Sequence, residues 1–152
     1  MATLTDTLGT RTSLAFSGSS LSTLASATYV QNTTAYDCHT SKPQDVIVEV
    51  DVGTTNSPTS LKQVSVFIRE SLDGTNYRSG PTSGTTATRE GELRLLGVIP
   101  LTTSSATPVG MFSVRQALGY IPYDFFVVVK NETGVALTSG TVFTCDVQTT
   151  VA

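Results

Sequence analysis

Residues 45–52 read DVIVEVDV, and this stretch decides the fold class. Valine occupies every second position from Val46 to Val52, and two acids, Glu49 and Asp51, lie between the valines. Alternation with a period of two is typical of a strand with one buried face and one face in water. Loop signals flank it, with Lys42-Pro43 before and a Gly-, Thr-, Asn- and Pro-containing stretch after. We therefore predict a half-buried strand here.

A second alternating segment, LKQVSVFIRES, occupies residues 61–71. It places Val64, Val66 and Ile68 on one face and mainly polar side chains on the other. Because only a short polar loop separates it from the first strand, we expect the two segments to be antiparallel neighbours in one sheet.

The rest of the chain divides into further strands and turns. Asp73-Gly74 is a strong hairpin signal because glycine accepts a positive φ. Residues 111–118, MFSVRQAL, fit either a strand or one helical turn. The other predicted strands are 92–101, 125–130 and 141–151, with one or two more near 13–16 and 25–30.

About seven or eight short strands with regular turn signals indicate an all-β, antiparallel β-sandwich. Both a jelly-roll and an immunoglobulin-like topology fit this pattern. The antibody type is excluded because it needs a tryptophan, which the chain lacks. The predicted core residues are Val46, Val48, Val50, Val64, Val66, Ile68, Phe126, Val128 and Phe143.

Composition agrees with this fold and excludes several functions. The chain has 152 residues, enough for one domain, and 27 Thr and 17 Ser but only 14% charged residues. Threonine favours strands, and a helical bundle would need far more Ala, Glu, Lys and Leu. A net charge of −3 argues against nucleic acid as a partner. We find no apolar run long enough for a membrane span and no signal peptide.

The sequence offers few groups for metal binding. His39 is the only histidine, and Cys38 and Cys145 are the only cysteines. With Asp146 they could hold zinc if their strands adjoin, but zinc sites normally show ligand pairs at a repeated spacing. We expect two free thiols, as is usual in a reducing compartment.

Candidate catalytic and binding groups have simpler structural interpretations. A Ser-His-Asp triad would need His39 beside an aspartate, and there is no Gly-x-Ser-x-Gly elbow. Glu49 and Asp51 lie on one strand face, as solubilising acids commonly do. Asp73 belongs to a turn that lacks the acidic twelfth position of a calcium loop. Five tyrosines could bind sugars, but they more simply cap the ends of the sandwich. We predict no enzyme, no cofactor and no metal.

Three motifs in the second half occur in a recognisable order. They are SLDGTNY at Ser71–Tyr77, LRLLG at Leu93–Gly97 and VVKNETG at Val128–Gly134. The stretch from Val46 to Val142 resembles the head decoration, or cement, proteins of tailed bacteriophages, a group of small virion structural proteins in which such motifs recur in this order.

This resemblance implies a non-enzymatic protein that binds the outside of a bacteriophage head and stabilises it. The implied partners are the major capsid protein and further copies of the chain in a homotrimer. The implied location is the outer surface of the virion, after synthesis in the bacterial host cytoplasm. The alternative is a receptor- or carbohydrate-binding β-sandwich module of a phage tail or adhesin.

The first 24 residues differ from the rest. We predict an N-terminal arm over residues 1–24 and a single β-sandwich domain over residues 25–152. The arm's apolar residues are spaced too irregularly for one strand face, so we expect it to dock on the capsid or a neighbouring copy by strand addition. The alternative is that residues 14–24 form the first strand of the sandwich. The candidate partner-binding residues are Leu4, Leu8, Leu14 and Phe16, and Leu21 and Leu24 follow in the same segment.

Overall fold

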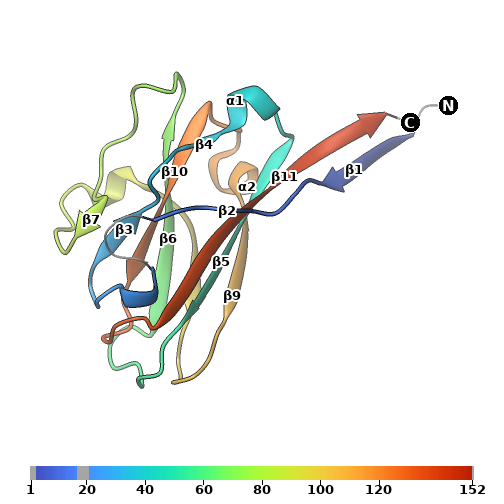
Figure 1. The fold of residues 1–152 in the computed structure, drawn as a ribbon. Coiled ribbons are helices and arrows are strands. Elements are labelled where there is room, and N and C mark those ends of the chain that lie inside the picture. Colours follow the sequence, from blue (N-terminus) through green and yellow to red (C-terminus); the bar gives the residue numbers. More distant parts are fainter. Residues whose placement is uncertain (1–2, 17–20, 152) are drawn as a thin grey trace.

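A computed structural model describes residues 3–16 and 21–151, which form two antiparallel sheets packed face to face (Figure 1). The first sheet has the order β1 (Leu4–Leu8), β11 (Ser139–Val151), β5 (Asp45–Gly53) and β9 (Val109–Ser113), with β2 (Thr12–Ser13) also beside β11. The second has the order β7 (Ser83–Gly84), β3 (Tyr29–Gln31), β10 (Asp124–Asn131), β6 (Gln63–Ser71) and β8 (Arg94–Pro100), with β4 (Tyr36–Asp37) also beside β10.

The prediction of an all-β antiparallel sandwich is confirmed. The described residues hold eleven strands rather than seven or eight, because β2, β4 and β7, of two residues each, add to the longer ones. Of residues 111–118, the first three are the end of β9 and the rest form a short helix. The strand and the helical turn considered for this segment are therefore both present in part. No helix in the described part of the chain is long and apolar enough to cross a membrane. The helical elements are η1 (Leu21–Thr23), α1 (Cys38–Ser41), η2 (Glu90–Glu92) and α2 (Val114–Leu118).

The prediction that the first two recognised strands are neighbours was wrong. β5 lies between β11 and β9 in the first sheet, whereas β6 lies between β10 and β8 in the second. The loop between them crosses from one sheet to the other. Alternation of apolar residues shows which face of a strand is buried, but it does not show which strand lies beside it.

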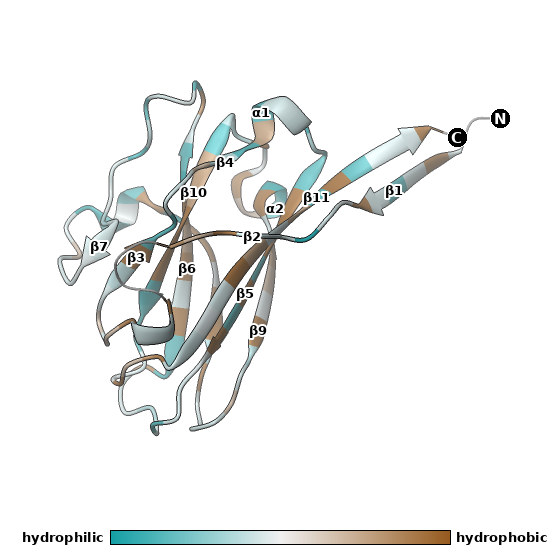
Figure 2. Cartoon of the chain, in the orientation of Figure 1, coloured by the Kyte–Doolittle hydropathy of each residue, from teal (hydrophilic) through white to brown (hydrophobic). Residues whose placement is uncertain are grey.

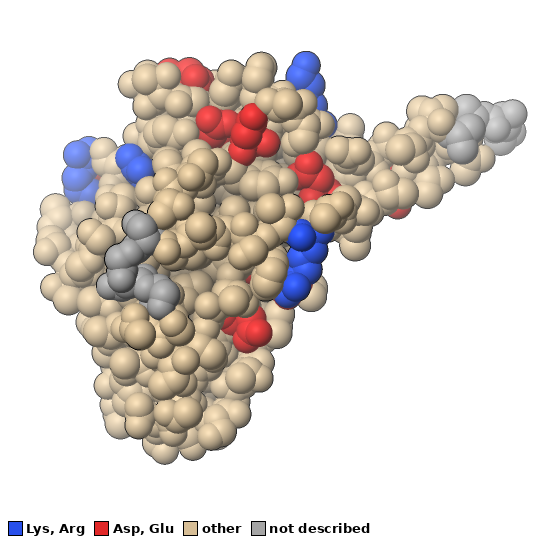
Figure 3. All heavy atoms as spheres, viewed as in Figure 1, with Lys and Arg blue, Asp and Glu red and all other residues tan. Residues whose placement is uncertain are grey.

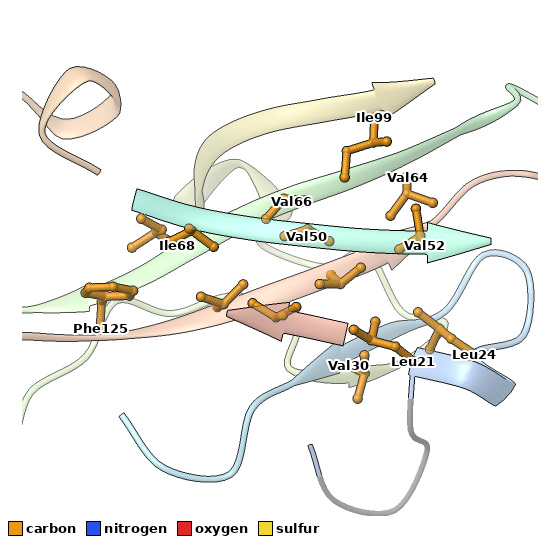
Figure 4. Close-up of a cluster of buried hydrophobic side chains, with 14 of the residues drawn as sticks. Leu21, Leu24, Val30, Val50, Val52, Val64, Val66, Ile68, Ile99 and Phe125 are labelled. Atoms are coloured by element: carbon orange, nitrogen blue, oxygen red, sulfur yellow. The ribbon is translucent and has the colours of Figure 1, made fainter. Parts of the chain in front are cut away.

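The core lies between the two sheets, where the alternating side chains of β5 face those of β6 and β10 (Figure 4). Full burial of an aliphatic side chain stabilises a fold by roughly 1.5–3 kcal/mol, so this layer dominates stability. The members from these three strands, each 0% exposed, are Val46, Val48, Val50, Val52, Val64, Val66, Ile68, Phe125, Val127 and Val129.

Three of the predicted core residues lie outside this layer: Phe126 and Phe143, which are half-buried, and Val128, which is buried on the outer side of its sheet. Phe125 points between the sheets, while the half-buried Phe126 ring packs on Tyr77 with ring centroids 4.9 Å apart. In β11, Val142 is buried and Phe143 is half-buried on the opposite face. The run FFVVVK is apolar at five successive positions, so its pattern does not reveal which alternate set points inward.

The N-terminal segment is not uniformly an arm. Leu21 and Leu24 are 2% and 1% exposed and belong to the core, so the expectation that the whole segment avoids it was wrong for these two. A side chain at Gly140 would collide with Leu21, which shows how closely η1 packs on β11. Leu14 and Phe16 are half-buried against the same core. The alternative of one strand over residues 14–24 is contradicted at residues 21–23, which form η1, and residues 17–20 lie outside the described residues.

Candidate binding surface on the first sheet

The outward-facing positions of β11 lie along one continuous face of the first sheet. They alternate with the buried residues Val142 and Thr144. Residues directly opposite each other in adjacent strands point to the same side of a sheet. The register places Leu4 opposite Val151 and Leu8 opposite Val147, so these four apolar residues share the outer face. Other outward residues of β11 on this face include Thr141, Phe143, Cys145 and Thr149.

One end of this face is a ribbon formed by β1 and the last five residues of β11. The ribbon projects from the body of the sandwich (Figure 1), and every residue of β1 is exposed. Leu4 and Leu8 are each 70% exposed, and Figure 2 shows apolar colour at both ends of β1. A two-stranded ribbon without a packed face is marginally stable in water, so this one is suited to order against a partner.

The backbone along the free side of β1 is also available. β1 is the last strand of its sheet, and the Gly9 N–H donates to the Asp146 carbonyl at 2.8 Å. Such contacts recur at every second residue of an antiparallel pair. The backbone groups of Thr7 therefore face β11, whereas those of Leu8, Asp6 and Leu4 face the open edge.

A groove of about 600 Å³ hollows the other end of the same face. Its apolar lining includes Ile47, Met111, Phe143 and Leu8, so the groove adjoins the base of the ribbon. Arg11 lies over Phe143, with its guanidinium carbon 3.3 Å from the ring centroid, and also forms an ion pair with Glu49 at 2.5 Å. The groove is thus an apolar surface with the ion pair of Arg11 and Glu49 at its edge.

Much of the outer face of the second sheet is covered by the chain itself, whereas Leu95 and Val98 of β8, at the edge of that face, are 53% and 39% exposed. Residues 72–93, which include β7, pass over that side in Figure 1. Beneath them Tyr29, Phe67, Leu93 and Val128 form a second small core. Val128 is therefore buried as predicted, but on the outer side of its sheet rather than between the sheets.

Polar contacts hold this cover in place. Glu90 accepts hydrogen bonds from the Tyr29 hydroxyl and from Lys130. Glu70, 3% exposed, forms an ion pair with Arg78 of the covering segment. Because these contacts join the loop to β3, β10 and β6, the loop is fixed to the sheet it covers.

The groups considered for a zinc site do not come together. Cys38 is buried, and burial, with the nearby Asp146 and Asp124 carboxylates, raises the pKa of its thiol to about 12. His39 stacks on Tyr123 with ring centroids 4.1 Å apart. The Cys145 thiol contacts the Gly9 carbonyl on the outer face, and both cysteines are free. The described residues contain no group of three or more potential metal ligands.

The carboxylates considered for chemistry take structural roles. Glu49 is bound by Arg11. Asp73 accepts hydrogen bonds from the backbone N–H groups of Asn76 and Thr75, and these contacts hold its pKa well below the usual range. This carboxylate closes the predicted Asp-Gly turn.

The tyrosines considered as a sugar platform are mostly packed. Tyr29 is 2% exposed, Tyr123 stacks on His39, and Tyr77 packs at a tilt against Phe126. The Tyr36 hydroxyl donates to Asp146 at 2.5 Å, and its pKa is raised by burial and by that carboxylate. Tyr120 alone is notably exposed among the five, at 37%. A flat row of aromatic rings for stacking a sugar is therefore not formed by these residues.

The candidate partner-binding residues separate into two pairs. Leu4 and Leu8 lie on the open face, while Leu14 and Phe16 pack against the chain's own core. Sequence reasoning missed Met111 and Phe143 as members of the surface. Their signal was present, since both stand at outward positions of alternating strands, but a lone apolar residue on a strand does not reveal whether something covers it. No protein-family model, curated protein or solved structure matches this chain.

Proposed function

We propose that this protein is a non-enzymatic structural protein of a virus particle, a decoration or cement protein that binds the outside of a bacteriophage head. The observation that carries the proposal is the projecting ribbon of β1 and β11. It combines exposed leucines with an open backbone edge. An exposed ribbon of this kind is expected in a protein that attaches to another protein.

Strand addition is the mode of attachment that suits this ribbon. A strand of the major capsid protein beside β1 would satisfy the backbone groups of Leu8, Asp6 and Leu4, which face the open edge. A protein that binds only the assembled lattice stabilises that lattice by mass action. The protein would act on the outer surface of the capsid after synthesis in the host cytoplasm, as a homo-oligomer.

Composition and surface support the proposal. Few charged side chains interrupt the face seen in Figure 3, and the chain is 14% charged. Threonine-rich strands keep such a surface hydrated without charge. The resemblance of residues 46–142 to head decoration proteins points the same way.

Proline substitution at the open edge tests the proposal. Asp6→Pro removes an N–H that faces away from β11, and edge strands tolerate proline there. We expect Asp6→Pro to weaken co-sedimentation with undecorated heads at least tenfold. Asp6→Ala keeps the N–H and is expected to bind heads like the unchanged chain. Equal binding by the proline variant, or no binding by the unchanged chain, would overturn the proposal.

A further inference from the structure

We propose that the open face of the first sheet binds a second copy of this chain, with the ribbon of each copy lying in the groove of the other. The inference concerns self-association and goes beyond head binding. It starts from the fact that ribbon and groove belong to one face. Leu8 lines the groove and also stands at the base of the ribbon, so the apolar surface runs from Met111 to Leu8, and Asp6 and Thr149 separate Leu8 from Leu4 and Val151.

A surface of this form can match itself. When two copies face each other about a two-fold axis at the base of the ribbon, the ribbon of each copy lies over the groove of its partner. Both contacts then form at once, as an isologous interface requires. The apolar side chains removed from water include Leu4, Leu8 and Met111, which are 70%, 70% and 67% exposed in the single chain.

Charge favours a second copy as the occupant. The outer face of the ribbon carries one acid, Asp6, between Leu4 and Leu8. The groove carries the ion pair of Arg11 and Glu49, in which the Arg11 side chain is 52% exposed and the Glu49 side chain 20%. In the two-fold arrangement the acid of each ribbon approaches Arg11, the more exposed member of the ion pair in the other groove. Complementary charges of this kind set partner choice and register.

The open backbone edge of β1 stays free in this arrangement. Side chains on the outer face make the contact between copies, while the N–H and C=O groups of the edge lie in the plane of the sheet. Self-association and strand addition therefore use different parts of the ribbon. The inferred assembly is a dimer, in place of the trimer that the resemblance implied.

Sedimentation velocity of the full chain over a hundredfold range of concentration tests the inference. We expect a dimer of twice 16.0 kDa. Met111→Lys is expected to weaken the dimer at least tenfold, with an unchanged melting temperature when monomeric. Leu61→Lys is the matched control, because Leu61 is also 67% exposed but lies outside this face, and it should dimerise normally. A monomer at all concentrations, a trimer, or equal loss in both variants would overturn the inference.

A charge exchange tests the register. Asp6→Arg alone and Arg11→Asp alone are each expected to dimerise weakly, because each places like charges across the interface. A mixture of the two variants restores both opposite-charge contacts and should form a heterodimer as tight as the unchanged dimer. A mixture no tighter than the separate variants would overturn the pairing. Head binding is measured separately, by co-sedimentation of the Asp6→Pro variant with heads. A chain that does not dimerise would therefore overturn this inference without overturning the proposed function.

Discussion

The outer face of the second sheet holds Phe67 at 7% exposure, while the outer face of the first sheet holds Met111 at 67%. Both residues stand at outward positions of strands in the same sandwich. Residues 72–93 make the difference, because they fold over the second sheet and form a second core with it. Nothing equivalent covers the first sheet among the described residues. An apolar face that the chain leaves open, beside one that it covers, is the feature from which we infer that another molecule belongs there.

The largest expected difference between the two faces is in side-chain truncation. Phe67→Ala leaves a cavity under the covering loop and should lower the free energy of unfolding by about 3–4 kcal/mol. Met111→Ala should change it by less than about 0.5 kcal/mol at a concentration where the chain is monomeric. Chemical denaturation monitored by circular dichroism measures both. Similar losses of unfolding free energy at Phe67 and Met111 would contradict the distinction between a covered and an open outer face.

A second comparison applies one substitution to two ion pairs, one that holds the covering segment and one on the open face of the first sheet. Glu70→Gln removes the buried charge that holds Arg78, and we expect a loss of about 1–2 kcal/mol because the buried carboxylate is 3% exposed. Glu49→Gln breaks the pair with the half-exposed Arg11 and should cost less than about 0.5 kcal/mol. Chemical denaturation of the two variants measures both losses. A larger loss for Glu49→Gln would contradict the assignment of Glu70 as the anchor of the cover.

The contrast between the faces also shows what the sequence could reveal. DVIVEVDV identified both the strand and its buried face, since the valines at alternate positions are all 0% exposed. The strand's neighbours were misassigned, because a polar loop can form a hairpin or cross between sheets. Within the covering loop, residues 79–91 are rich in Gly, Ser and Thr, so their sequence has no pattern that predicts packing against a sheet. Its anchors are single residues, such as Leu93 and Glu90, whose partners lie far away in the sequence.

The open surface was only partly predictable for the same reason. Leu4 and Leu8 were chosen because they stand in polar, irregular sequence, and they are exposed. Leu21 and Leu24 stand in similar sequence but are buried, because η1 brings them to the end of the sandwich. Whether an isolated apolar residue is covered depends on contacts between distant segments, which local patterns do not encode.

The smallest expected effect concerns acid and the polar contacts on the covered side. Burial of Glu132 would raise the pKa of its carboxyl, but hydrogen bonds from Gln63, Ser65 and Lys130 outweigh it and hold the pKa below its ordinary value of 4.5. A carboxyl whose pKa is lowered by folding stabilises the fold above its unfolded-state pKa. That contribution is lost as the pH falls through the lowered value. Because the side chain is 14% exposed and water screens it in part, we expect less than about 1 kcal/mol.

Glu132→Gln isolates this contribution because it keeps the shape of the side chain and removes its titration. The unfolding free energy of the unchanged chain should fall more between about pH 6 and pH 3 than that of the variant. The difference between the two decreases in unfolding free energy measures the contribution of the contacts with Gln63, Ser65 and Lys130. Equal decreases in unfolding free energy would mean that the contacts of Glu132 do not stabilise the covered side against acid, and that the apolar cluster of Tyr29 and Phe67 does. The polar contacts would then position the side chains that surround that cluster without adding to its stability in acid.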